Sequence, residues 1–272
     1  MTNNRTRNMA AVSAALIAGV LLGLPQSSWA SQPAYAAASF AAAPQQDIAV
    51  SRAAEAKLNK DRFGNVTVNV ENGIATLRGT VNLYEYKSDA EKRVLQAKGV
   101  SAVRNLIQVT GPAISDHDLQ SKLAEKLSYD RVGFGNVFNA ISVHVQNGAV
   151  TLGGHARTYV DRDSAIALVS TTPGVKDVVN NIEVDPVSIM DDQTRMAVAR
   201  AIYGYPSLNK YALNPAKPIR ISVQNGHVEL FGVVDSPADR NTAGLRANTV
   251  PGVFSVKNYL QVANEPTEKA DK

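Results

Sequence analysis

The residue types best suited to contact a ligand are concentrated in one segment, YGYPSLNKYALNPAKPIR, which begins at Tyr203. Tyrosines stand among cations there, and this mixture suits an anionic membrane surface, because the rings bury apolar area while each cation near phosphate contributes about 1 kcal/mol. Leu208 and Leu213 would add shallow insertion. The other interpretation is a proline-braced loop that packs its tyrosines on its own domain. The candidate lipid-contacting residues are Tyr203, Tyr205, Leu208, Lys210, Tyr211, Lys217 and Arg220.

Catalytic and metal-binding patterns are not found elsewhere in the sequence. No two of the four histidines stand four residues apart on one expected helix, so they do not predict a metal site. The patterns of serine hydrolases, P-loop proteins and zinc peptidases do not occur. Gly133-Phe134-Gly135 predicts a flexible loop, not a phosphate cradle. We therefore expect a protein that is not an enzyme and has no cofactor and no metal. The histidines are His117, His144, His155 and His227.

Composition restricts the partners. The sequence contains no cysteine, which excludes disulfides, thiolate nucleophiles and cysteine-ligated metals. The formal net charge of +4 is too small for strong phosphate binding, so no nucleic-acid partner is expected.

The first 36 residues have the pattern of a secretory signal peptide. Arg5 and Arg7 precede an uncharged run from Met9 to Leu24, and small residues allow cleavage after Ala30 or Ala36. An uncleaved membrane anchor is the alternative, but the run is short for a span of about 20 residues. We expect an exported protein, periplasmic or otherwise extracytoplasmic, that is soluble after cleavage.

One sequence pattern occurs three times. The copies VTVNVENGIATLRGTV, ISVHVQNGAVTLGGHA and IRISVQNGHVELFGVV are followed, at constant distances, by GVSAVRNLIQV, GVKDVVNNIEV and GVFSVKNYLQV. The copies are offset by 75 and 78 residues, which indicates a tandem repeat of one folding unit.

The Asn-Gly pair in each copy predicts a two-residue hairpin turn, because a type I′ turn needs positive φ at both central positions. In the first copy this register places Val70 opposite Ala75 and Val68 opposite Leu77 on one face of the sheet. A glycine opposite the first apolar residue of each hairpin indicates close approach of another backbone, and we expect a helix to cross there.

A helical pattern precedes each hairpin, and a second one follows it. The first helices are expected over Ala49–Leu58, around Leu119 with an N-cap at Ser115 or Asp116, and around Met196. The last of these is expected to be capped near Asp191 or Asp192. The second helix of each copy is expected to end at a glycine in the left-handed conformation.

These elements predict an α+β fold of three tandem αββαβ modules, each a three-stranded sheet with two helices on one face. The crossover from the second strand to the third is expected to be right-handed. Periodicity leaves open which of the two hairpin strands lies beside the third strand.

This combination of turn, glycine and closing strand resembles the BON domain (bacterial OsmY and nodulation). The match reads VNVENGIATLRG, VHVQNGAVTLGG and ISVQNGHVELFG with the three closing strands, and it covers residues 47–263. The third copy departs from the pattern only by Tyr259 before Leu260. The resemblance implies three tandem BON domains in an OsmY-like periplasmic protein, with phospholipid binding, osmotic or envelope stress and chaperone-like roles. It implies no catalytic residue.

An asparagine recurs in the third strand of each copy, and we expect it to cap a helix or satisfy a backbone group. The residues assigned to the structural motif are Asn72, Gly73, Gly79, Gly99, Asn105, Asn147, Gly148, Gly154, Gly174, Asn180, Asn225, Gly226, Gly232, Gly252 and Asn258.

The expected domain boundaries follow from the repeats and the terminal composition. They are a signal peptide over 1–36, a linker over 37–46, modules over 47–112, 113–186 and 187–264, and a flexible tail over 265–272. The modules differ in charge: the outer two carry +3 each and the middle one −3. Either the charged side chains form ordinary solvated faces, or the outer modules contact anionic surfaces.

Three functions remain in competition. The leading hypothesis is an exported, non-enzymatic protein that binds anionic phospholipid or another part of the envelope and contributes to stress tolerance. The alternatives are a periplasmic holdase that binds unfolded clients and a structural adaptor that docks envelope proteins.

Overall fold

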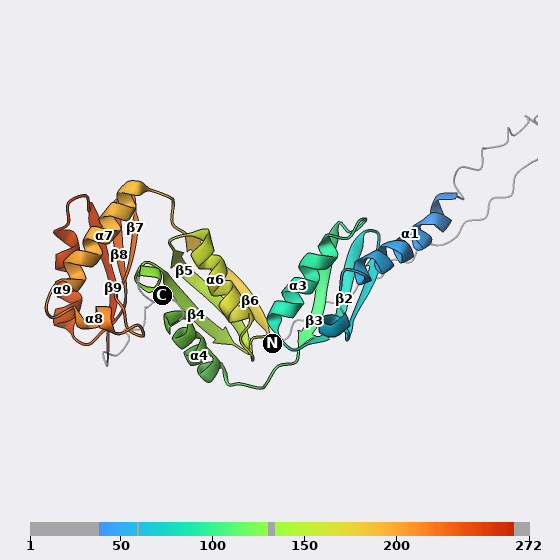
Figure 1. Cartoon of the computed structure of the whole chain (residues 1–272), viewed down its shortest axis with the longest axis horizontal. Coiled ribbons are helices and arrows are strands. Elements are labelled where there is room, and N and C mark those ends of the chain that lie inside the picture. Colours follow the sequence, from blue (N-terminus) through green and yellow to red (C-terminus); the bar gives the residue numbers. More distant parts are fainter. Residues whose placement is uncertain (1–37, 59, 130–133, 264–272) are drawn as a thin grey trace, which may run out of the picture. The chain divides into compact units, whose positions relative to one another are not determined.

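The computed structural model describes residues 38–58, 60–129 and 134–263, and within them each repeat forms its own sheet with its own helices (Figure 1). The predicted α+β class and αββαβ order are confirmed, with one short helical turn added before each hairpin. The predicted signal peptide, its two cleavage positions and the tail over 265–272 lie outside the described residues.

The first helix of module 1 starts earlier than predicted. It begins at Ala38, within the predicted linker, and ends at Glu55, not Leu58. Alanine is the strongest helix former, which explains why this alanine-rich segment continues the helix. The elements of module 1 are α1 (Ala38–Glu55), α2 (Lys60–Phe63), β1 (Val66–Glu71), β2 (Ile74–Val81), α3 (Tyr84–Leu95) and β3 (Ala102–Val109).

Module 2 confirms one predicted cap and corrects one predicted loop. The hydroxyl of Ser115 accepts a hydrogen bond from the Asp118 amide at 3.1 Å, so Ser115 is the N-cap. A helical turn begins at Phe134, where a flexible loop was predicted, and the buried Asn136 amide holds this turn by donating to the Ser128 carbonyl at 3.0 Å. The elements of module 2 are α4 (Asp116–Tyr129), α5 (Phe134–Val137), β4 (Ala140–Gln146), β5 (Ala149–Ala156), α6 (Tyr159–Ser170) and β6 (Asp177–Val184).

The first helix of module 3 is capped by Ser188, whose hydroxyl accepts from the Asp191 amide at 3.1 Å. The prediction of a cap at Asp191 or Asp192 was therefore wrong. Both carboxylates lie in the first turn, where the helix dipole favours negative charge. The elements of module 3 are α7 (Ile189–Tyr203), α8 (Lys210–Leu213), β7 (Arg220–Gln224), β8 (His227–Val234), α9 (Pro237–Asn248) and β9 (Ser255–Val262).

The second strand lies at the centre of every sheet. The strand orders are β1-β2-β3, β4-β5-β6 and β7-β8-β9, and the third strand runs parallel to the second. This settles the neighbour that periodicity left open. The predicted register is confirmed, with Val68 opposite Leu77 and Val70 opposite Ala75. Asn72 and Gly73 have φ angles of 51° and 77°, as a type I′ turn requires.

The strand glycines do meet another backbone, but it is not that of a helix. A Cβ on Gly154 would lie 2.0 Å from the Ala140 carbonyl oxygen, at the start of β4. Equivalent contacts are made by Gly79 with Asn65 and by Gly232 with Pro218. The predicted helix crossing was wrong at all three positions, because the start of the hairpin's own first strand fills the space.

A carboxylate of the first helix holds the hairpin turn in each module, from the first turn of the helix in modules 2 and 3 and from within α1 in module 1. The Asp116 carboxylate accepts from the Asn147 and Gly148 amides at 2.6 and 2.9 Å. Asp191 accepts from both turn amides of module 3 at 2.9 Å. Asp47 makes a single longer contact, 3.2 Å, to the Asn72 amide. These contacts tie the first helix of each module to its turn.

In modules 1 and 3 the recurring asparagine of the third strand joins that strand to the second helix. The Asn105 side chain donates to the Lys87 carbonyl of α3 at 2.8 Å, and Asn258 donates to the Arg240 carbonyl of α9 at 2.7 Å. The side-chain oxygen of Asn180 accepts from the Ile182 amide of the same strand. These contacts support the predicted structural role.

A separate core lies between the helices and one face of each sheet, and the core of module 3 also contains Phe138 of module 2. In module 1 this core includes Leu77, Ala90 and Val94, all fully buried. We call the opposite side of each sheet the helix-free face. No helix among the described residues is long and apolar enough to cross a membrane.

Candidate functional site

The centre of the predicted lipid-contacting segment is part of the core of module 3. Leu208 is fully buried and Tyr211 is 3% exposed. The Tyr211 hydroxyl donates to the Asp239 carboxylate at 2.8 Å and accepts from the Asp235 amide at 2.7 Å. These two side chains anchor the segment and do not offer a surface to a ligand.

Two further members of the predicted set are also withdrawn from solvent. The Tyr203 hydroxyl donates to the Ile219 carbonyl, and burial raises the pKa of this phenol. Arg220 is half-buried, and burial lowers the pKa of its guanidinium. The structure therefore agrees with the alternative of a loop packed on its own module for Tyr203, Leu208 and Tyr211.

The remaining members lie at the surface. Lys210 pairs with the carboxylates of Asp235 and Asp239 at 2.9 and 3.0 Å, which raises the pKa of the lysine. Tyr205 is 39% exposed, and the Arg246 guanidinium lies 5.3 Å from its ring centre. Lys217 is exposed. Leu213, at the end of α8, is 80% exposed.

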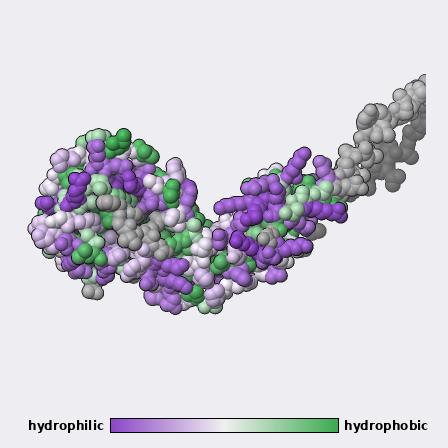
Figure 2. Space-filling view, in the orientation of Figure 1, coloured by the Kyte–Doolittle hydropathy of each residue, from purple (hydrophilic) through white to green (hydrophobic). Residues whose placement is uncertain are grey.

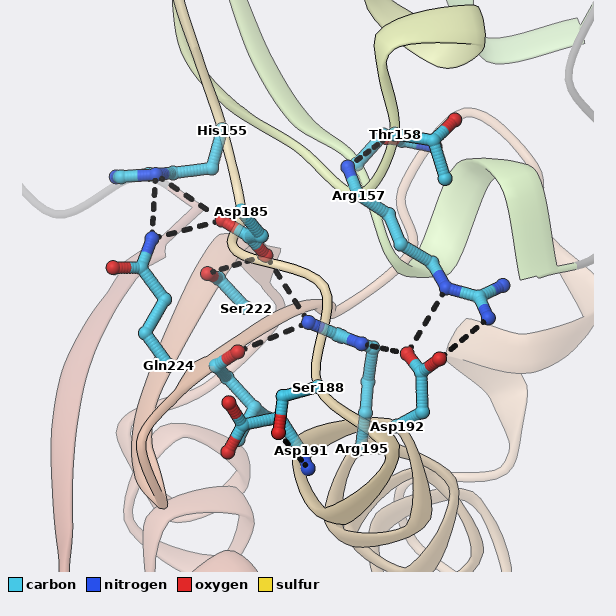
Figure 3. A network of polar contacts seen from close by, with 12 residues as sticks. His155, Arg157, Thr158, Asp185, Ser188, Asp191, Asp192, Arg195, Ser222 and Gln224 are labelled. Carbon is cyan, nitrogen blue, oxygen red and sulfur yellow. Dashed lines mark hydrogen bonds and ion pairs between the residues drawn. The ribbon is translucent and has the colours of Figure 1, made fainter.

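A polar network that the sequence did not reveal joins modules 2 and 3 (Figure 3). Its centre is the buried pair Arg195–Asp185, with 3.1 Å between guanidinium nitrogen and carboxylate oxygen and side chains that are 2% and 1% exposed. The same Arg195 nitrogen donates to the Val223 carbonyl at 3.0 Å. Ser222 also donates to Asp185, at 3.3 Å. The end of β6 is thereby fixed to α7 and β7.

The network continues on both sides of this pair. Asp192 binds Arg195 and also pairs with Arg157 of module 2 at 3.1 Å, and the Arg157 contact lowers the pKa of Asp192. The guanidinium carbons of Arg195 and Arg157 lie 5.9 and 6.0 Å from the centre of the Phe138 ring. Because Arg157 and Arg195 are matched by Asp185 and Asp192, this site is suited to hold two modules together.

His155 forms the other end of the network. Its Nδ1 atom lies 3.5 Å from Asp185 and 3.3 Å from the Gln224 side-chain nitrogen, and its Nε2 atom lies 4.0 Å from Glu229. The hydrogen bond with Asp185 raises the pKa of His155. No cluster of three potential metal ligands occurs among the described residues, and the four histidines are not brought together there.

The sequence held one signal for this network. Arg195 lies four residues before Ala199 and seven before Ile202, so a cation occupies the apolar stripe of the predicted helix. A buried cation needs a partner. The sequence could not identify that partner as Asp185, which precedes the helix and belongs to the end of another module.

Exposed apolar side chains gather near the same joint. Figure 2 shows hydrophobic residues along the upper edge of the view, over the start of α7. The starts of α6 and α7 are linked by the contact between Arg157 and Asp192. The exposed residues, with their exposed fractions, are Tyr159 (64%), Val160 (77%), Val187 (96%), Ile189 (76%) and Met190 (70%).

Comparison with known proteins identifies the repeat. The family model described as BON domain matches residues 47–111, 115–186 and 192–264. No curated protein matches the sequence.

Two solved structures show weak similarity. The first is CdsD, a structural protein of the Type III secretion system of Chlamydia trachomatis: 18% identity, 78% of this chain and 91% of that chain covered, and a TM-score of 0.23. The second is the PrgH periplasmic domain: 12% identity, 79% and 98% covered, and a TM-score of 0.19.

Proposed function

The chain belongs to the BON domain family, and from this premise we propose that it is a non-enzymatic, exported binding protein of the cell envelope. In this proposal module 3 contacts anionic phospholipid through the exposed part of the segment around α8, and this binding contributes to envelope or osmotic stress tolerance. The phospholipid contact is the feature that a direct binding experiment can test.

The observation that carries the proposal is that one part of this segment is fixed in the core of module 3 while another part is exposed. We call the exposed part, which contains Leu213 and Lys217, the tip. Tyr211 and Leu208 fix the segment in the core, while Leu213 is 80% exposed and Lys217 is exposed four residues later. A fixed apolar side chain next to a cation suits the headgroup boundary: the leucine enters the apolar region and the lysine meets phosphate at about 1 kcal/mol. Anchoring also lowers the entropy cost of ordering the tip.

The test is flotation of the mature chain with vesicles of phosphatidylcholine, with or without phosphatidylglycerol, at low and high salt. We expect binding only to the vesicles with phosphatidylglycerol, and weaker binding at high salt. The double variant Leu213→Ser/Lys217→Gln should remove most of it. Substitution of Tyr211 is unsuitable because this side chain belongs to the core.

Module 1 offers a matched control. Leu95 is 51% exposed and Lys98, three residues later, is exposed as well. The variant Leu95→Ser/Lys98→Gln removes the same types of side chain from another surface and should float like the wild type. Equal loss of binding in both variants, or no binding of the wild type, would refute the proposed contact.

A second candidate function is the binding of unfolded protein clients. The exposed side chains of Val187, Ile189 and Met190 near the joint of modules 2 and 3 favour it, since grouped apolar residues at a surface mark interaction sites. The chain should then suppress aggregation of reduced insulin without lipid. Ile189→Ser/Met190→Ser should lose this activity, and Leu213→Ser/Lys217→Gln should keep it.

A further inference from the structure

The helix-free face of module 3 differs from its counterparts in the other modules. Its strand register aligns Gln224, His227 and Ser255 in one row across β7, β8 and β9. The next row contains Ser222, Glu229 and Lys257, and the row after that begins with Arg220 and continues through Phe231 to Tyr259. Polar rows are therefore bordered by an aromatic pair.

A cavity of about 530 Å³ lies over the polar rows. This volume is within the range of small-molecule sites, roughly 300–1,000 Å³. Its lining includes Gln224, His227, Glu229 and Lys257 of module 3 together with His155 of module 2. The cavity thus presents amide, imidazole, carboxylate and ammonium groups, which include both hydrogen-bond donors and acceptors.

The charges that line this cavity are compensated within the protein. The Lys257 ammonium lies 3.2 Å from the Glu229 carboxylate. His155 faces Asp185, which in turn pairs with Arg195. A charged ligand would have to break these pairs, whereas an uncharged ligand with hydroxyl groups can hydrogen-bond to their remaining donors and acceptors. The lining therefore favours a neutral polar ligand.

Aromatic residues lie in the strand row next to those that line the cavity, and another lies beside His227 of the lining. Phe231 and Tyr259 stack with 5.3 Å between ring centres and 17° between ring planes. Tyr259 is 51% exposed. Phe254 is 76% exposed and meets the His227 ring edge-on at 6.1 Å. Exposed ring faces next to hydrogen-bonding groups fit a ligand that is apolar on one side and polar at its rim.

The other copies of the repeat do not carry these rings. The offsets of 78 and 75 residues align Phe231 with Gly153 and Arg78. Tyr259 aligns in the same way with Asn181 and Leu106. The fold of one module does not require aromatic residues at these positions. Phe231 also packs on His155 of module 2, with 6.3 Å between ring centres, whereas Tyr259 is 51% exposed and calls for another explanation.

From these observations we infer that the helix-free face of module 3 is a binding site for an uncharged saccharide. A sugar ring stacks on the exposed face of Tyr259, which Phe231 supports by stacking on it, and the sugar hydroxyl groups hydrogen-bond to Glu229, Lys257 and Gln224. A pyranose ring meets both requirements, with apolar C–H faces and a rim of hydroxyls. This site is separate from the phospholipid contact around α8 and does not depend on it.

The experiment is isothermal titration calorimetry of the mature full chain with cellotetraose and with N-acetylglucosamine tetramer as probes. Saturable binding of at least one probe is expected. Tyr259→Ala should weaken this binding at least tenfold, and Phe231→Leu should weaken it as well. Leu106→Ala, the equivalent change in module 1, should leave it unchanged. Leu213→Ser/Lys217→Gln should also leave it unchanged, which separates saccharide binding from phospholipid binding.

Thermal unfolding of each variant shows whether module 3 still folds, and the exposed Tyr259 is the safer of the two aromatic positions. The inference fails if neither tetrasaccharide binds at millimolar concentration, or if folded Tyr259→Ala binds as well as the wild type. A site that takes an extended neutral peptide and excludes both saccharides would also overturn it.

Discussion

At the scale of single residues, the strand glycines show the strictest requirement of the fold. Gly154 has a φ of +86°, and a Cβ there would lie 2.0 Å from the Ala140 carbonyl oxygen. Its neighbour Gly153 has no positive φ, and its Cβ would meet only the Ser142 hydroxyl at 3.2 Å. Two adjacent glycines of one strand are therefore under very different constraints.

We expect Gly154→Ala to lower the free energy of unfolding by more than about 2 kcal/mol, because it combines backbone strain with a clash. Gly153→Ala should change it by less than about 1 kcal/mol, since a hydroxyl can move. Urea unfolding monitored by circular dichroism measures both. Similar losses for the two variants would contradict the assigned geometry.

The aspartates that hold the hairpin turns allow a second prediction. Asp191 accepts two turn amides at 2.9 Å and is 4% exposed, whereas Asp47 accepts one at 3.2 Å. Because hydrogen bonds to charged groups contribute about 1.5–3 kcal/mol each, Asp191→Ala should destabilise module 3 by at least about 2 kcal/mol. Asp47→Ala should cost clearly less. The midpoints of urea unfolding measure the loss of stability in both variants. A larger loss for Asp47→Ala than for Asp191→Ala would disprove this ranking.

At the scale of elements, α7 differs from α1 and α4 because one of its cationic side chains, that of Arg195, is buried in contact with another module. Arg195 pairs with Asp185 at 3.1 Å, and both side chains are almost fully buried. Such a pair adds little net stability relative to a well-packed apolar pair, but the loss of one partner leaves a buried charge without compensation. The pair therefore fixes which surfaces meet at this joint.

Arg195→Met is expected to cost about 3–5 kcal/mol of unfolding free energy, and adding Asp185→Asn should recover part of that loss. Arg162→Met removes the guanidinium from the more exposed pair with Asp163 and should cost at most about 1 kcal/mol. Chemical denaturation of the wild type, Arg195→Met, Asp185→Asn, the double variant and Arg162→Met tests this. If the double variant were as unstable as the sum of its single variants, Arg195 and Asp185 would not act as a pair.

At the scale of the whole molecule, the three copies share a fold but differ in what their surfaces carry. Module 3 has the exposed tip around α8 and the aromatic pair of its helix-free face, while modules 2 and 3 share the network around Asp185. The repeat determines the fold of each module, and the residues at positions that the fold does not constrain differ between the modules.

The joint between modules 2 and 3 should respond to pH through His155. The pKa of folded His155 is raised, first by the hydrogen bond with Asp185 and further by the charges of Asp185, Glu183 and Glu229. Protonation of His155 therefore stabilises the folded protein fully below the unfolded pKa of about 6.5. This stabilisation is lost as pH rises through the folded pKa.

We expect the thermal unfolding temperature of the wild type to fall, relative to His155→Gln, as pH rises above about 6.5. Scanning calorimetry of both proteins across this range measures the difference. His144→Gln, in the same module, serves as a control for histidine substitution. A constant difference between wild type and His155→Gln at every pH would show that the contact with Asp185 does not depend on protonation.

The sequence by itself determined the repeated unit, because an Asn-Gly turn and alternating valines constrain the chain within a few residues of themselves. It predicted the register of Val68 and Leu77, the order of helices and strands and the family, while a helix start such as Ser188 was missed because several capping residues stand close together. Tertiary structure alone decided that Tyr211 lies in the core, that Arg195 meets Asp185, and that Phe231 and Tyr259 stack on each other. These contacts join residues 10 to 28 positions apart, and burial and pairing at such distances depend on how whole elements pack, which local sequence patterns do not encode.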